Sequence, residues 1–389
     1  MKKDHKFDKS KKSKKPKKPK KMVTISQQVG DTRELAFPTA EGFGAYAKGG
    51  KGGDRYTVTS TSASGIGTLK DAVDTQVYGV PRTIDFAVGG VIQLTSQLEI
   101  TKPYLTIDGS TAPSPGISTR DYEVSVENTH DIVIRHIRFR TGDAFPDSIR
   151  DGLQLFEVEN CIVDHCSFFW AVDENMGNVG GSDLTIQWCI LAEGLMAADH
   201  PSGDHSMGLI HLNVKSSTIH HNLFTHNNER NPRASGDVDI VNNIVYNYGN
   251  IGTDISNDNV TGTPDTRANV ENNYWIEGPS SPNPAFVRYF RVREGASAWV
   301  SGNYIDNNDN GVLDGVLATT YAGDGDATIT TRYNFPQVET ETALEAYTSV
   351  LAGAGATLPS RDAHDARVVA DVSAETGAII DSQTEVGGW

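Results

Sequence analysis

The chain has 389 residues, which is enough to bury a large hydrophobic core in one or two domains. Its 38 glycines and its 8% of aromatic residues are typical of a turn-rich, β-rich globular protein and argue against a helical or a disordered chain. The net charge of −16 argues against a body that binds nucleic acid.

The charge is distributed unevenly along the chain. Residues 1–21 carry 12 of the 34 basic residues and two of the 50 acidic ones, which leaves 22 basic and 48 acidic residues, or about −26, for the rest. We predict that residues 1–30 form a disordered, lysine-rich tail. This tail is either an appendage that aids solubility or a polybasic arm that tethers the protein to polyanions.

Residues 31–100 are expected to form an N-terminal cap and the first strands. Within them, residues 64–73 read as a turn that leads into a short helix. Residues 105–109 are expected to belong to an early strand of the repeating part of the chain.

From about residue 100 onward, a short apolar alternation returns repeatedly, followed by a small or amide residue and then an apolar or aromatic one. The equivalent positions are Ile137, Cys166, Cys189, Asn222, Asn243, Asn273 and Asn303. Their separations of roughly 20 to 33 residues are those of a solenoid, whose units bury their apolar faces by stacking. The recurring asparagine suits a bend between strands, because asparagine tolerates a left-handed backbone and can hydrogen-bond along a ladder.

This pattern predicts an all-β protein, a right-handed parallel β-helix with an N-terminal cap and a C-terminal covering segment. Residues 339–370 have helical spacing and are expected to cover the C-terminal part of the coil. We predict a single domain over residues 31–389.

Charged residues recur at corresponding points of the repeating unit. Asp151 and the pair Asp173 and Glu174 precede the arginines Arg230 and Arg233. Stacking would bring these residues to one face. Such a face suits an acidic polymer that is held through a divalent cation while a proton is removed from it.

Several motifs in order resemble polysaccharide lyase family 1, the pectate lyases. They lie at residues 36–45, 89–92, 106–109 and 163–168, in His221-Asn222 with Arg230-x-Pro232, and at residues 385–389. The resemblance covers about residues 36–389. It implies a parallel β-helix that binds Ca²⁺ and cleaves polygalacturonate by β-elimination to unsaturated oligogalacturonides.

The resemblance also implies roles for individual residues. Asp151, Asp173 and Glu174 fall where the family places calcium ligands, and Arg230 matches the arginine that acts as the base. Arg233 and His205 are assigned to substrate contact. The chain departs from the family pattern at several positions. Ile149 replaces a second acidic residue, Ser235 replaces a further arginine, Cys161-Ile162 stands where a tryptophan is usual, and residues 205–209 occupy the region of a lysine that contacts substrate.

Other histidines and acids have plainer interpretations. Asp164 and His165 lie within a strand pattern, so we expect them to form hydrogen bonds between coils. His220 and His221 are neighbours in a predicted strand and should point to opposite faces, which argues against a transition-metal site.

The expected partner is an acidic polysaccharide, polygalacturonate or pectin, with no nucleic acid and no membrane. The chain has no apolar run of transmembrane length and no signal-peptide core, and we expect a monomeric, secreted enzyme. Three alternatives remain at this point: a non-catalytic polysaccharide-binding β-helix, a hydrolase that uses two carboxylates, and a lyase for another uronate polymer. A pectin lyase is disfavoured because methylated polymer needs no calcium.

Overall fold

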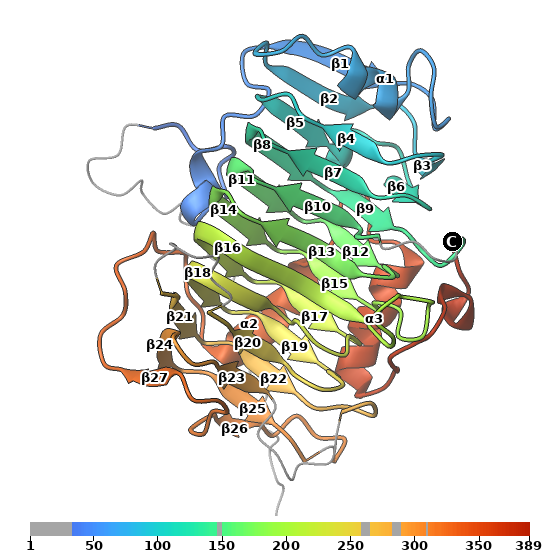
Figure 1. Cartoon of the computed structure of the whole chain (residues 1–389). Helices are drawn as coiled ribbons and strands as arrows, with labels where there is room; N and C mark the ends of the chain where they lie inside the picture. Colours follow the sequence, from blue (N-terminus) through green and yellow to red (C-terminus); the bar gives the residue numbers. More distant parts are fainter. Residues whose placement is uncertain (1–32, 146–149, 258–264, 282–288, 309) are drawn as a thin grey trace, which may run out of the picture. The chain divides into compact units, whose positions relative to one another are not determined.

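A computed structural model describes residues 33–145, 150–257, 265–281, 289–308 and 310–389. The predictions for the tail of residues 1–30 and for Ile149 lie outside these residues. The described chain winds into stacked coils, and successive coils place their strands side by side (Figure 1).

One sheet of the described residues contains 17 strands, and all of its paired neighbours run parallel. These strands are β1 Asp54–Val58, β2 Arg82–Phe86, β4 Leu98–Ile100, β5 Leu105–Asp108, β7 Val124–Glu127, β8 His130–Arg135, β10 Leu153–Phe156, β11 Glu159–Asp164, β13 Glu174–Val179, β14 Ser182–Gln187, β16 Met207–His220, β18 Arg233–Val241, β20 Thr253–Ile255, β21 Arg267–Glu271, β23 Phe290–Val292, β24 Ser297–Ser301 and β27 Asp326–Ile329.

A second sheet of the described residues contains ten strands, parallel except for the last pair. These strands are β3 Gly90–Gln93, β6 Ile117–Arg120, β9 Ile137–Arg140, β12 Ser167–Phe169, β15 Ile190–Ala192, β17 Leu223–Thr225, β19 Ile244–Tyr246, β22 Tyr274–Ile276, β25 Tyr304–Asp306 and β26 Val316–Leu317. The predicted fold class, a right-handed parallel β-helix, is confirmed.

The larger sheet consists of two columns of strands. One column runs through β7, β10 and β13 to the first half of β16, and the other through β8, β11 and β14 to its second half. Strands β16 and β18 each span both columns and join them. The column that begins with β4 and β7 carries the candidate site described below.

Apolar side chains in register form the core between the sheets. Ile134 pairs with Val163, Val163 with Ile186, and Ile186 with Ile219, and each of these side chains is buried. No single coil could bury these residues alone, so stacking provides the hydrophobic stabilisation of the fold.

The predicted asparagine ladder is present. The Asn243 Oδ1 accepts hydrogen bonds from the Asn222 backbone and side chain at 3.0 Å, and the Asn273 Oδ1 accepts the same pair from Asn243 at 2.9 and 3.0 Å. The expectation that the ladder asparagines themselves adopt a left-handed backbone was wrong. The preceding residues, such as Asn242 with φ 55°, adopt the left-handed conformation, whereas the ladder asparagines do not.

The N-terminal region divides into two parts. Helix α1 (Leu69–Asp74) is capped by Thr68, as the turn pattern predicts, and it packs against β1 at the start of the coil. The 3-10 helix η1 (Phe43–Tyr46) instead lies against β11, β14 and β16. The prediction that the whole of residues 31–100 forms a cap and first strands was therefore wrong for this segment, which covers the side of the coil. A second 3-10 helix, η2 (Gly109–Thr111), follows β5.

The two C-terminal helices, α2 (Ala343–Gly353) and α3 (Ala363–Ala374), run back along the ten-stranded sheet (Figure 1). Their apolar residues pack with Phe169, Ile190 and Ile244, which belong to the middle of the coil. The expectation that this segment covers the C-terminal part was wrong in extent, because the apolar face of the sheet continues through the middle coils. The 3-10 helix η3 (Gln383–Val386) follows.

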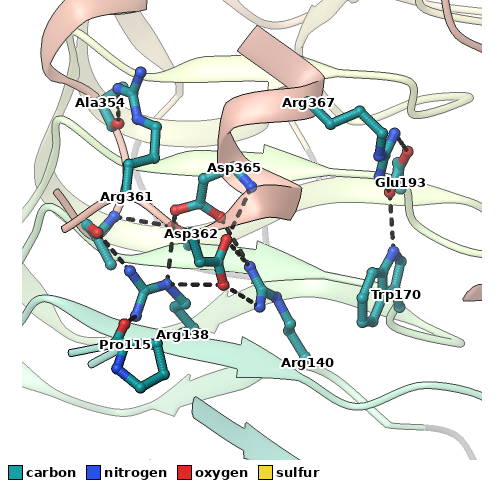
Figure 2. A network of polar contacts seen from close by, with 12 residues as sticks. Pro115, Arg138, Arg140, Trp170, Glu193, Ala354, Arg361, Asp362, Asp365 and Arg367 are labelled. Carbon is teal, nitrogen blue, oxygen red and sulfur yellow. Dashed lines mark hydrogen bonds and ion pairs between the residues drawn. The ribbon is translucent and has the colours of Figure 1, made fainter. Parts of the chain in front are cut away.

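A buried ionic network anchors α3 to the sheet (Figure 2). Arg140 pairs with Asp362 and, at 2.9 Å, with Asp365, and Arg138 donates to the Ala356 carbonyl at 2.8 Å. No helix among the described residues is long and apolar enough to span a membrane.

Candidate functional site

The candidate site lies at the N-terminal ends of neighbouring strands in one column of the larger sheet. Asp151 stands shortly before β10, Asp173 and Glu174 stand at the start of β13, and Arg230 stands three residues before β18. Parallel pairing keeps β10, β13, β16 and β18 in register, so residues far apart in sequence come to adjacent coils.

The three predicted calcium ligands lie together. Asp151, Asp173 and Glu174 each offer one carboxylate oxygen, and these atoms all lie within 4.8 Å of one another. The Glu174 N–H donates to the Asp151 Oδ1 at 3.1 Å, which fixes the two coils relative to each other. Asp151 and Glu174 are buried, and the side chain of Asp173 is 19% exposed.

A fourth carboxylate, which the sequence analysis missed, joins this group. The Glu123 Oε2 accepts a hydrogen bond from the Asp151 backbone N–H at 3.1 Å. Burial raises the pKa of Glu123, and the charges of Glu127 and Asp173 raise it further. A signal was available, because Glu123 immediately precedes β7, the strand one coil before β10.

The electrostatics of this cluster favour a cation. Burial raises the pKa of the Asp151 carboxyl well above its usual range, and the charges of Asp173 and Glu123 add to this, while Arg230 acts in the opposite direction. Crowded, partly dehydrated carboxylates bind either protons or a metal ion. Oxygen ligands of this kind suit Ca²⁺.

Arg230 contacts the acidic cluster directly. Its Nη1 forms an ion pair with Glu174, and its side chain is 19% exposed, so part of the guanidinium is accessible to solvent. The backbone of Arg230 is left-handed, with φ 60°, an uncommon conformation for a residue with a side chain. Left-handed residues recur through the described coil, for example at His165 and Asn242, so this conformation belongs to the coil geometry and does not by itself mark a site.

Arg233 belongs to a second group of charges on the following coils. Its Nε lies 4.0 Å from the Asp254 Oδ2, which also accepts from Arg291 at 2.7 Å and from Arg293 at 2.6 Å. Burial raises the pKa of Asp254, but the hydrogen bonds from the last two arginines outweigh it, so the net shift is downward. The sequence analysis missed Arg291 and Arg293 because they lie outside the repeating pattern of apolar and amide residues.

His205 lies on Asp173. The His205 Nε2 is 2.8 Å from the Asp173 Oδ1, and the His200 Nε2 is 3.6 Å from the same oxygen. Both imidazoles are largely buried, with exposed fractions of 7–8%. The structure therefore brings His205 to the site, where it contacts a predicted metal ligand, and substrate contact by His205 stays a prediction.

Two further sets of residues considered in the sequence analysis lie away from the acidic cluster: Asp164 with His165, and His220 with His221. Arg135 and Gln187, from the coils on either side, donate to Asp164 at 2.7 and 2.8 Å, which confirms the predicted bonding between coils for Asp164. The His165 side chain instead bonds to its neighbour Asp164 at 2.8 Å. The reason given for His220 and His221 was wrong. Their Nδ1 atoms lie 2.8 Å apart, because His221 leaves the strand with φ 53°. In the described chain, neither belongs to a three-residue group that could hold a metal.

At the position of the missing family arginine, Ser235 is buried and its Oγ accepts from the Asn213 N–H at 2.9 Å. The Ser235 side chain therefore forms a hydrogen bond between the neighbouring strands β16 and β18. The described residues thus combine one acidic cluster, one arginine in contact with it, and a group of arginines on the next coils.

No protein-family model matches the chain. Among curated proteins, it is 37% identical over 362 residues to "Probable pectate lyase C" of Aspergillus terreus, covering 91% of this chain and 81% of that protein. It is 36% identical over 375 residues to the protein of the same name from Aspergillus fumigatus, covering 94% and 84%.

Solved structures share the fold at low sequence identity. The cedar pollen allergen jun a 1 superposes with a TM-score of 0.58 at 18% identity, covering 81% of this chain and 92% of its own. Pectate lyase C of Erwinia chrysanthemi, determined with Ca²⁺, gives 0.54 at 17% identity, covering 84% and 99%. A Bacillus pectate lyase in complex with trigalacturonate gives 0.54 at 16%, covering 81% and 98%.

Proposed function

The chain belongs to the pectate lyases and is a polysaccharide lyase, and on this premise we propose that it cleaves polygalacturonate by calcium-dependent β-elimination. The product would be an unsaturated oligogalacturonide. The observation that carries the proposal is the contact between Arg230 and a cluster of crowded carboxylates.

The calcium ligands we propose are Asp151, Asp173 and Glu174, with Glu123 behind them. Their fit to a divalent cation rests on burial and charge, because burial first, and then the charges of Asp173 and Glu123, raise the pKa of Asp151 despite the opposing charge of Arg230. Calcium held there would supply positive charge beside the substrate carboxylate and offset the charge that develops when the neighbouring proton leaves.

Arg230 is proposed to accept the proton from C5, the carbon that bears the carboxylate. The electron pair of the C5–H bond then forms the C4–C5 double bond, and the glycosidic oxygen leaves C4 with the electron pair of the C4–O bond and takes a proton from water. Arginine is protonated at neutral pH, so we expect activity to be highest in alkaline solution.

The arginines on the following coils are proposed to hold the polymer. Arg233 was assigned this role from the sequence, and Arg291 and Arg293 lie beside it around Asp254. Guanidiniums bind carboxylates through paired hydrogen bonds, so this group suits the uronate units of the bound chain.

The decisive experiment measures the ultraviolet absorbance of the conjugated double bond. Polygalacturonate is incubated with the protein at about pH 9, with calcium and then with excess chelator. A rise that the chelator abolishes supports the proposal, whereas reducing ends without absorbance would indicate hydrolysis. If polygalacturonate gives neither absorbance nor reducing ends and another uronate polymer gives absorbance, that polymer would replace polygalacturonate as the proposed substrate.

We also propose that the enzyme acts outside the cell and as a monomer. The first part is supported by the size of its substrate, since a polyuronate is too large to reach an internal enzyme. Size-exclusion chromatography with light scattering tests the second part.

A further inference from the structure

The loop between β15 and β16 carries two histidines and is closed at its base. The His205 N–H donates to the Met196 carbonyl at 2.8 Å, and the Ser206 N–H donates to the Leu195 carbonyl at 3.0 Å. The Gly203 N–H donates to the His200 carbonyl at 2.9 Å and forms a turn within the loop. These bonds place the two imidazoles next to each other.

The imidazoles of His200 and His205 stack and face one carboxylate. Their ring centroids are 3.7 Å apart and their planes differ by 22°. Both Nε2 atoms point to the same oxygen of Asp173, at 3.6 and 2.8 Å. The carboxylate is thus held from one side by a stacked pair of rings.

The hydrogen bonds of His200 distinguish a donor from a metal ligand. The Ser202 N–H donates to the His200 Nδ1 at 3.1 Å, so this nitrogen offers a lone pair. A neutral ring then carries its proton on Nε2, the atom that faces Asp173. A metal ion bound at Nε2 would need a lone pair there, and the contact with Ser202 would be lost. The geometry therefore turns an N–H of His200 toward Asp173 at 3.6 Å, an electrostatic contact longer than a hydrogen bond, while His205 at 2.8 Å is the hydrogen-bond donor.

A hydrogen bond and an ion pair, shown in Figure 2, join the segment that precedes Asp173 to the segment that begins the histidine loop. The Trp170 Nε1 donates to the Glu193 Oε2 at 2.9 Å, and Arg367 of α3 pairs with the same carboxylate at 2.6 and 2.7 Å. Trp170 lies three residues before Asp173, and Glu193 begins the histidine loop. The network therefore limits relative movement of the carboxylate and the imidazoles.

We propose that His200 and His205 are positioning residues that hold the Asp173 carboxylate ready for calcium. The inference rests on the proposed function, in which Asp173 is a calcium ligand. Groups that orient a metal ligand through hydrogen bonds usually change metal affinity by about 10- to 100-fold when they are removed. His205, with the shorter contact, is expected to contribute more than His200.

The test is calcium titration calorimetry on the full chain, together with kcat and KM. His205→Ala is expected to weaken calcium binding by about tenfold or more, with kcat recovering at saturating calcium. His205→Gln should restore most of the affinity, because its amide can donate from a similar position. The matched control is His130→Ala, whose imidazole lies 2.8 Å from Asp131 on the surface, and its calcium affinity should be unchanged.

Two outcomes would overturn the inference. Unchanged calcium affinity with a raised KM would make His205 a substrate contact, as the sequence suggested. Stoichiometric Zn²⁺ binding that both alanine variants abolish would make the pair metal ligands. Asp173→Asn tests the calcium-ligand role of Asp173 separately from the positioning role of the histidines. Calcium binding that survives this change would refute the proposed ligand set, on which the inference rests.

Discussion

Two groups of buried carboxylates differ in how their charge is compensated. Beneath α3, Asp362 and Asp365 meet Arg138 and Arg140. Burial raises the pKa of Asp362, but these arginines outweigh it and lower the pKa well below its usual range, whereas burial keeps the pKa of the deeper Asp365 raised despite the same arginines. Negative and positive groups are present there in equal number, and the network joins a helix to the sheet.

On the larger sheet, in the column that begins with β4 and β7, acids outnumber bases. Asp151, Asp173, Glu174 and Glu123 lie close together, with Arg230 paired to one of them. The pKa of Asp151 is raised by burial first and then by its acidic neighbours. The contrast teaches that a balanced cluster serves folding, whereas an acidic excess in the same fold marks a place for a cation.

The largest expected effect separates the arginine of the acidic cluster from arginines elsewhere. Arg230→Lys should lower kcat by about a thousandfold, because a lysine of different geometry cannot replace a positioned base. The same substitution at the exposed Arg267, which pairs with Asp237, should leave kcat near the parent value. Steady-state ultraviolet assays measure both, and an Arg230→Lys enzyme with normal kcat would exclude Arg230 as the base.

The cluster of Asp362, Asp365, Arg138 and Arg140 is tested by removing one of its two positive charges. Arg140→Met leaves Asp362 and Asp365 buried together and should cost about 3–5 kcal/mol of unfolding free energy. Urea denaturation measures this loss. The same change at Arg267, whose side chain is about half exposed and pairs with the partly exposed Asp237, should cost less than about 1 kcal/mol. Equal losses at the two sites would show that burial of the pair has no consequence.

The acidic cluster should be stabilised by added positive charge, so calcium should increase the unfolding free energy of the protein. Free calcium at a hundredfold excess over Kd should raise the unfolding free energy by about 2.7 kcal/mol. Asp151→Asn should abolish this gain and, with chelator, leave stability unchanged or higher, because it removes a poorly compensated buried charge. Thermal unfolding with and without calcium measures both quantities, and a gain that survives in the variant would exclude Asp151 as a ligand.

The smallest expected effect concerns pH and a compensated carboxylate between coils. Burial opposes the charged form of Asp164, but His165 and Arg135 outweigh it and lower its pKa from 3.8 to about 2. Its contribution of about 2 kcal/mol is therefore present above pH 4 and is lost as the pH falls through about 2. The stability difference between the parent and Asp164→Asn should shrink over that range in urea titrations. A constant difference would contradict the pKa shift.

The sequence predicted the features that repeat along the chain. The apolar alternation predicted stacked coils, and the recurrent asparagines predicted a ladder that the structure contains. The juxtaposition of Asp151, Asp173 and Glu174 also followed, because equivalent positions of a parallel repeat lie on one column. Their roles remain proposals.

Features outside the repeat could not be predicted in this way. The contact of His200 with Asp173 depends on the turn of one irregular loop, and the position of α3 depends on a buried charge network with residues more than 200 positions away. Left-handed residues before the ladder were also misassigned by one position.

By itself, the sequence determined the β-helix, its core and the column that gathers the acids, because a periodic pattern of apolar and amide residues has one favourable way to stack. Only the tertiary structure decided which charges are compensated. Compensation depends on burial and on distances of a few ångströms between side chains from different coils, loops and helices, and linear order does not encode those distances.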